Sequence, residues 1–185
     1  MKKLSRRTTL VTSGAVIAAV AAGTFGAVTA SASAPAAAPA AAAKADAKNN
    51  NTMSTTHLTA DAAQKAAQAA LAEAKKENQK VSVAVVDRNG NTILTVRGDG
   101  AGPQSYEAAE KKAFTAVSWN APTSELAKRL ENAPTLKDIP GTLFLGGGAP
   151  VTAKGAPIAG IGVAGAPSGD IDEKIAQAGV ASLGK

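Results

Sequence analysis

Two glutamates, Glu107 and Glu110, stand three positions apart in a stretch with helical periodicity. Residues three apart share one face of a helix, so the two carboxylates can offer hard oxygen ligands to a single iron ion. Glu107 also stands four positions before Lys111, which is the spacing of an ordinary ion pair on a solvated helix. His57 is the only histidine and therefore the only imidazole available to a metal. These residues leave iron binding and a plain surface helix as open alternatives.

Other chemistries are excluded by composition. The chain has no cysteine, so disulfides, thiolate metal sites and cysteine nucleophiles are absent. With one histidine and no cysteine, the usual nucleophile–base pairs of catalysis are nearly excluded as well. We therefore identify no catalytic residues, and a binding protein is favoured over an enzyme.

The glycine-rich runs have two interpretations. One run occupies residues 146–148, and the other places Gly160, Gly162 and Gly165 within an apolar stretch. Neither run precedes a helix in the way a phosphate-binding loop requires, so a nucleotide site is rejected. Glycines at such spacing suit either tight turns and close packing of a helix on a sheet, or the close approach of a ligand to the backbone.

The first 32 residues have the order of a secretory signal peptide. A basic start with Arg6 and Arg7 precedes the nearly uncharged residues 10–28, and small residues suited to cleavage follow up to Ala32. A membrane anchor is less suitable, because Thr, Ser and Gly dilute the apolar stretch. The paired arginines followed by Leu10 favour the twin-arginine route, which exports folded proteins, over an ordinary leader. We expect a secreted protein.

Removal of this leader changes the charge of the chain. Four of the 20 Lys and Arg residues lie in residues 1–32 and none of the 14 acidic residues does, so 16 basic groups remain and the formal charge falls from +6 to +2. A nucleic-acid-binding domain needs a basic face that persists in the mature chain. No nucleic-acid partner is expected.

The remaining chain divides into a tether and one domain. Residues 33–54 are rich in Ala, Pro and Asn and have too little apolar surface to form a core, so we predict a disordered tether. Residues 55–185 are long enough for a single domain. Helices are predicted at 59–77 and 105–119, and then from a cap at Thr123 or Ser124 to about 131. A last helix runs to 181 from a cap at Ser168 or Asp170.

Strands are predicted between these helices. Residues 81–86 and 92–97 flank an Asn-Gly turn and form a hairpin, residues 143–145 form a short strand, and residues 151–163 form a second hairpin around Lys154 and Gly155. The element order αββααββα predicts an α+β fold, a two-layer sandwich with an antiparallel sheet and flanking helices.

An ordered series of five motifs carries a family resemblance. The series consists of VAVVDRNG at 83–90 followed by Arg97, AEKKAFTA at 109–116, LGGGAP at 145–150, GIGVAGA at 160–166, and Asp172 with Gly179. It resembles the GlcG/HbpS family of haem-degrading-domain proteins over residues 55–185, and the leader points to its secreted, haem-binding HbpS branch.

The resemblance implies several properties. The fold would be related to PAS and profilin-like sandwiches, assembled as a homo-octamer. The protein would bind haem and iron outside the cell and act on a membrane sensor kinase of a two-component system under oxidative stress. Two alternatives remain: a haem-degrading or GlcG-like enzyme, and an oligomer that scavenges haem or iron without signalling.

The resemblance also implies site residues. Thr142 corresponds to a threonine associated with the haem iron. A neutral hydroxyl is a poor iron ligand, so a threonine that satisfies a strand end is the open alternative. Glu107 and Glu110 correspond to an iron motif that His57 can complete. The propionates of haem need cations, for which Arg97 and Lys111 are our candidates and Lys112 and Lys154 the alternatives. Aromatic residues are scarce, and Phe114 and Phe144 are expected in the core, so the haem site should be shallow or shared between subunits.

Overall fold

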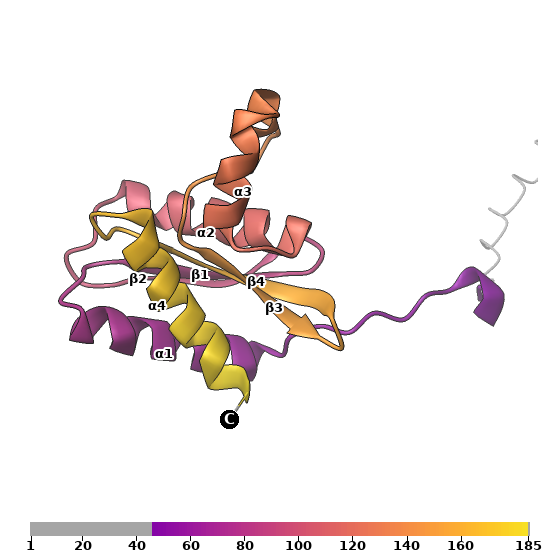
Figure 1. The fold of residues 1–185 in the computed structure, drawn as a ribbon. Coiled ribbons are helices and arrows are strands. Elements are labelled where there is room, and N and C mark those ends of the chain that lie inside the picture. The colour runs from indigo at the N-terminus through magenta and orange to yellow at the C-terminus, as the bar shows by residue number, and fades with distance from the viewer. Residues whose placement is uncertain (1–45, 185) are drawn as a thin grey trace, which may run out of the picture. The chain divides into compact units, whose positions relative to one another are not determined.

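The computed structural model describes residues 46–184 and places an antiparallel sheet between two layers of helices (Figure 1). The four strands are β1 (Ser82–Asp87), β2 (Thr92–Arg97), β3 (Gly148–Ala153) and β4 (Ala156–Ala164), in the sheet order β2-β1-β4-β3. The helices are α1 (Ala60–Lys76), α2 (Gln104–Trp119), α3 (Thr123–Lys128) and α4 (Gly169–Ala181). The α+β class and the order αββααββα are confirmed.

The number of layers differs from the prediction. Side chains of β1 alternate between two cores: Val83 and Val85 pack with α1 and α4, while Ala84 and Val86 pack with α2. Helices therefore cover both faces of the sheet, which makes a helix–sheet–helix arrangement in place of a two-layer sandwich. The physical reason is visible in the central strands, because β1 and β4 are buried along almost their whole length on both faces.

The strand registers follow from the two predicted hairpins. Val83 faces Val96 of β2 on one side and Val163 of β4 on the other, and all pairings are antiparallel. The turn between β1 and β2 is organised by Asp87, whose carboxylate accepts hydrogen bonds from the backbone N–H groups of Asn89 and Asn91. Gly90 has a φ of +88°, which explains why glycine follows Asn89 in this turn.

The outer helices begin where the sequence indicated. Thr59 caps α1 by accepting a hydrogen bond from the N–H of Ala62, and Ser168 caps α4 by accepting one from Ile171. Ser168, not Asp170, is therefore the cap of α4. Both helices bury small residues, which lets them lie side by side against one face of the sheet.

The glycines of β4 serve helix packing. An ideal β-carbon at Gly162 would overlap the carbonyl oxygen of Ala109, and one at Gly160 would overlap that of Ala113. The backbone of α2 therefore touches the sheet directly at these two positions. This favours the packing interpretation of the glycine-rich stretch over a ligand-facing surface.

Two local predictions were wrong. Residues 143–145 are not a strand: Phe144 is buried in a small cluster with Leu126, and its ring meets that of Trp119 edge-on at 5.2 Å. The strand begins instead at Gly148. Neither Thr123 nor Ser124 caps α3, because the Thr123 hydroxyl accepts from the N–H of Gly148 and Ser124 bonds to α4.

The predicted signal peptide and residues 33–45 of the predicted tether lie outside the described residues. Residues 46–56 are exposed and contain one short 3-10 helix at Asn49–Asn51. Within residues 46–184, no helix is both long enough and apolar enough to span a bilayer.

Candidate functional site

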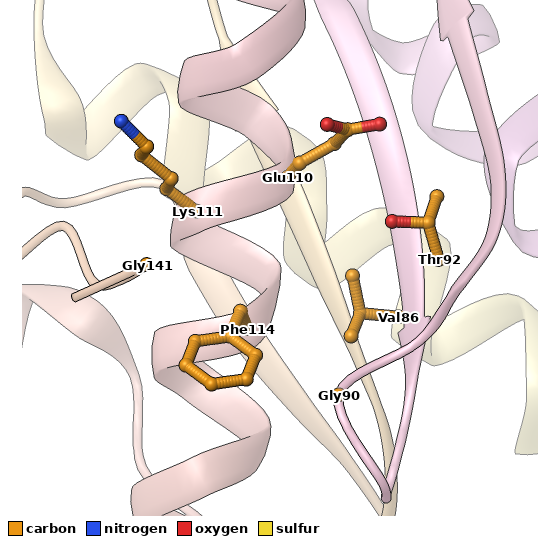
Figure 2. Close-up of a pocket in the computed structure, with 7 residues that line it drawn as sticks. All are labelled: Val86, Gly90, Thr92, Glu110, Lys111, Phe114 and Gly141. Atoms are coloured by element: carbon orange, nitrogen blue, oxygen red, sulfur yellow. The ribbon is translucent and has the colours of Figure 1, made fainter.

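A hollow of about 260 Å³ lies where α2 crosses the β1–β2 hairpin. Its walls are Val86 and Phe114, and its edges carry Thr92, Glu110 and Lys111; Gly90 and Gly141 complete the lining. Figure 2 shows the Phe114 ring hanging from α2 between the loop that carries Gly141 and the hairpin turn. The hollow is thus mainly apolar, with one acid and one base at its rim.

A second hollow, of about 190 Å³, adjoins the other side of Lys111. It is lined by Gln104, Glu107, Ala108, Lys111 and Leu143. Lys111 lines both hollows, and Gly141 and Leu143 belong one to each. We call the two hollows together the α2 groove, and we define it by the residues that line them.

The two glutamates of the predicted iron motif occupy different parts of the α2 groove. Glu107 forms an ion pair with Lys111, with Oε1 at 2.6 Å from Nζ, and the hydrogen bond from Lys111 lowers the pKa of the Glu107 carboxyl. Glu110 accepts a hydrogen bond from the Thr95 hydroxyl at 2.7 Å. The surface ion pair expected from the i,i+4 spacing is thus formed, while Glu110 turns toward β2.

The other predicted ligands lie outside the α2 groove. His57 is exposed, and its Nε2 lies 2.7 Å from the Thr55 hydroxyl. Arg97 is exposed at the end of β2, opposite Ser82, and Lys154 is exposed in the β3–β4 turn. Between residues 46 and 184, no three His, Asp or Glu side chains are grouped so that they could hold a metal ion. His57 does not join Glu107 and Glu110.

Thr142 stands in the chain between Gly141, which lines the first hollow, and Leu143, which lines the second. It is half-buried, and its hydroxyl donates a hydrogen bond to the carbonyl oxygen of Ile139 at 2.7 Å. This bond uses the donor of the hydroxyl and leaves its lone pairs available as acceptors. The following residue, Leu143, donates its N–H to the hydroxyl of Thr115 on α2 at 2.8 Å.

Lys112, an alternative cation for haem, is instead a buried structural residue. Only 2 % of its side chain is exposed; Nζ lies 2.8 Å from Oδ2 of Asp172 and 3.0 Å from the carbonyl oxygen of Val163. Burial raises the pKa of Asp172, and the hydrogen bond from Lys112 partly offsets that rise. The next residue, Glu173, accepts hydrogen bonds from the N–H and the hydroxyl of Ser124. These contacts fasten α4 to α2 and α3.

The sequence did not reveal the apolar walls of the groove. Phe114 was expected in the core, but it is only half-buried and faces the first hollow, while Phe144 is buried as expected. A usable signal existed, because Phe114 follows Glu110 by four residues and so shares its face of the helix. Val86, Gly90 and Thr92 line the hollow because of the way the β1–β2 hairpin packs against α2. The spacing of these residues in the sequence does not specify that packing.

The side chains that line the groove are of types that can contact one edge of a flat, largely apolar macrocycle. Small-ligand sites usually have volumes of about 300–1,000 Å³ and combine apolar walls with a few polar groups. The first hollow lies below that range, so a porphyrin would be only partly covered by one chain. Lys111 supplies a cation for a carboxylate substituent, and the Phe114 ring supplies a face for stacking.

Comparison with known proteins places this chain in a family. The family model described as "Haem degrading protein HbpS-like" matches residues 58–181. No curated protein matches the chain. Among solved structures, HbpS is 72% identical, with 76% of this chain and 100% of that chain covered and a TM-score of 0.75.

Two further structures extend the comparison. Streptomyces reticuli HbpS, as a double mutant in which two glutamates three positions apart are changed to aspartate, is 71% identical over 78% of this chain and 99% of that chain, with a TM-score of 0.76. A complex of PduOC with haem is 29% identical over 69% of this chain and 95% of that chain, with a TM-score of 0.63. By sequence and by fold, the chain belongs to the HbpS-like family of haem-degrading proteins.

Proposed function

We propose that the protein binds haem in the α2 groove. The observation that carries this proposal is the coincidence of apolar walls, a stacking ring and a cation in the first hollow, whose lining residue Gly141 directly precedes Thr142 in the chain. The solved haem complex of PduOC, a more distant relative, supports haem as the ligand class. Bound haem would supply the redox chemistry of its iron. We identify no nucleophile or general base of this chain that would take part in it.

Each residue of the groove has a separate role in this proposal. Val86 and Phe114 provide apolar contact for one edge of the porphyrin. Lys111 provides charge for a propionate, and exchanges its present partner Glu107 for it. Thr142 presents hydroxyl lone pairs toward the ligand or toward a water, because its proton is already given to Ile139. Arg97 lies outside the groove at the end of β2, so it would pair with a propionate only of a haem that extends beyond that strand.

A hemin titration of the purified protein, followed in the Soret band, tests the proposal. We expect saturable binding with a shifted Soret maximum. Thr142→Ala should alter the spectrum, and Lys111→Met should weaken binding by about fivefold through the loss of one charge-assisted contact. Lys76→Met is the matched control, because Lys76 forms a similar ion pair with Glu73 on α1, which packs on the opposite face of the sheet from α2. A protein that leaves hemin absorbance as it is in buffer is not a haem-binding protein.

Iron binding is a second proposal for the same helix. Glu107 and Glu110 are the only glutamates of this chain that stand three apart, and the Streptomyces mutant alters two glutamates with that spacing. We expect Glu107→Ala/Glu110→Ala to weaken the binding of free iron and to leave the hemin spectrum unchanged. His57→Ala should have no effect on iron, since His57 does not meet these carboxylates. A variant with wild-type iron affinity by calorimetry rejects the two glutamates as ligands.

Export, assembly and signalling complete the proposal. Secretion through a twin-arginine signal, assembly into a homo-octamer and action on a membrane sensor kinase rest on the leader sequence and on the resemblance to the HbpS branch. Light scattering of the purified protein tests the octamer. Analysis of haem products after incubation with a reductant separates haem storage from degradation, because only degradation yields an opened tetrapyrrole and released iron.

A further inference from the structure

The Thr115 hydroxyl joins two parts of the α2 groove. It accepts a hydrogen bond from the N–H of Leu143 at 2.8 Å and donates one to the carbonyl oxygen of Lys111 at 2.7 Å. Thr115 itself is fully buried, with no exposed surface. One buried oxygen therefore connects the backbone beside Thr142 with the backbone of Lys111.

The segment around Thr142 lies outside the regular elements. Residues 142–147 are not in a helix or a strand; Phe144 packs on Trp119, and the Gly147 carbonyl oxygen accepts a hydrogen bond from the N–H of Val163. The Thr142 N–H and hydroxyl both bond to Ile139, which belongs to the same loop. The next side-chain anchors toward the C-terminus are Glu173, which accepts from Gly147, and Thr123, which accepts from Gly148. Two contacts therefore hold this segment on α2 close to Thr142: the hydrogen bond from Leu143 to Thr115, and the Phe144 ring against Trp119. The bond to Thr115 is the one next to Thr142 in the chain.

We propose that Thr115 is a positioning residue that places Thr142 and Lys111 at the spacing that haem binding requires. The proposal rests on the haem site proposed above and adds a residue that does not touch the ligand. Because the hydroxyl both donates and accepts, valine of the same shape cannot replace it: the Leu143 N–H would lose its partner and the loop would move to find another. Serine retains both functions.

Ser118 provides a matched control on the same helix. Its hydroxyl donates to the carbonyl oxygen of Phe114 at 2.7 Å. The bond from Thr115 to Lys111 has the same i to i−4 pattern and lies about one turn closer to the N-terminus of α2. Ser118 is exposed, and it holds no bond from the 139–148 segment among those that the described residues form. Ser118→Ala therefore removes the bond within the helix without releasing the loop.

The test compares Thr115→Val, Thr115→Ser and Ser118→Ala in hemin titrations and thermal unfolding. We expect Thr115→Val to weaken hemin binding by about tenfold and to move the Soret maximum, as loss of one buried hydrogen bond at the site would do. Thr115→Ser should bind hemin within about twofold of the wild type, and Ser118→Ala should match the wild type. A Thr115→Val protein with lowered thermal stability but wild-type hemin affinity and spectrum overturns the positioning role.

A second measurement works even if Thr115→Val does not fold. In the wild-type protein, hydrogen exchange of the Leu143 amide should be slow and should become slower when hemin is added. An amide that exchanges at the same rate with and without hemin overturns the proposal. Failure of the wild type to bind hemin at all is a different result, which removes the proposed function itself.

Discussion

The buried ion pair between Lys112 and Asp172 predicts a large loss of stability when one charge is removed. Asp172→Asn keeps the shape of the side chain and leaves Lys112 as an unpaired cation in a site where 2 % of its side chain is exposed. Removing one partner of a buried pair typically costs about 3–5 kcal/mol, because the remaining charge has lost both water and its counterion. Small domains have a free energy of unfolding of about 5–15 kcal/mol. The single change should therefore remove a large part of the stability.

The assay is urea unfolding followed by far-UV circular dichroism, with the free energy of unfolding extrapolated to water. Glu107→Gln is the matched control, since it breaks the Lys111 pair, in which 41 % and 72 % of the two side chains are exposed. Exposed pairs contribute about 0–1 kcal/mol, so this control should unfold almost like the wild type. The double variant Lys112→Met/Asp172→Leu should recover most of the loss, because an apolar pair of similar volume carries no unpaired charge.

Some loss should remain in the double variant. Asp172 also accepts the N–H of Ala166 at 3.0 Å, and Lys112 donates to the carbonyl oxygen of Val163, so two backbone groups lose partners. We expect a residual cost of about 1–3 kcal/mol from these groups. A loss below about 1 kcal/mol in Asp172→Asn would refute the reasoning, because it would equal that of an exposed pair. Lys112 would then reach water in the folded protein.

Three further predictions concern stability. Gly162→Ala should cost about 3 kcal/mol in urea unfolding, because its methyl group overlaps the α2 backbone, whereas Gly184→Ala, with nothing within 4 Å, should be neutral. Thr59→Ala should lower the free energy of unfolding by about 1 kcal/mol, because α1 loses its N-terminal cap. A variant with the stability and the helix content of the wild type would contradict this. The hydrogen bond from Lys111 lowers the pKa of Glu107, so the unfolded state binds more protons than the native state just below the ordinary Glu pKa; the free energy of unfolding should fall slightly as pH falls through that window, and Glu107→Gln should remove this small slope.

Most elements of the fold were predictable because each carries a local signal. Thr59 and Ser168 begin helices because their side chains satisfy free N–H groups in the first turn, which is a property of the adjacent sequence alone. The Asn89-Gly90 turn is equally local, since Gly90 adopts a positive φ that other residues avoid. Such local features are sufficient to predict the correct element order without knowledge of the packing.

The wrong predictions concern residues whose roles are tertiary. Phe144 occurs in a short apolar run that resembles a strand, but it is buried against Trp119 and Leu126 in a separate cluster. Thr123 has the composition of a helix cap, yet its hydroxyl serves the N–H of Gly148. In both cases a partner distant in sequence competes successfully with the local pattern.

The predicted ligand residues show the same division. The pair of Lys111 with Glu107 is one of the two alternatives that the sequence leaves open, and it forms because i,i+4 spacing fixes their proximity on a helix. The sequence offers Lys112 as an alternative cation for haem, but it lies on the buried stripe of α2 with Ala109, Ala113 and Ala116. A charge in such a stripe indicates a buried partner, and Asp172 stands in the corresponding stripe of α4 with Ile175 and Ala176. The pairing of the two stripes required the three-dimensional structure.

The position of the α2 groove follows from the glycines of β4. Because Gly160 and Gly162 have no side chains, the backbone of α2 settles directly on β4, toward one side of the sheet. The opposite strand, β2, is then covered only in part, and its Thr92 borders the first hollow with Val86 of β1. Larger residues in β4 would lift α2 from the sheet and change the depth of that hollow. The glycine-rich stretch thus determines the proposed haem site through packing, without any need for the glycines to touch the ligand.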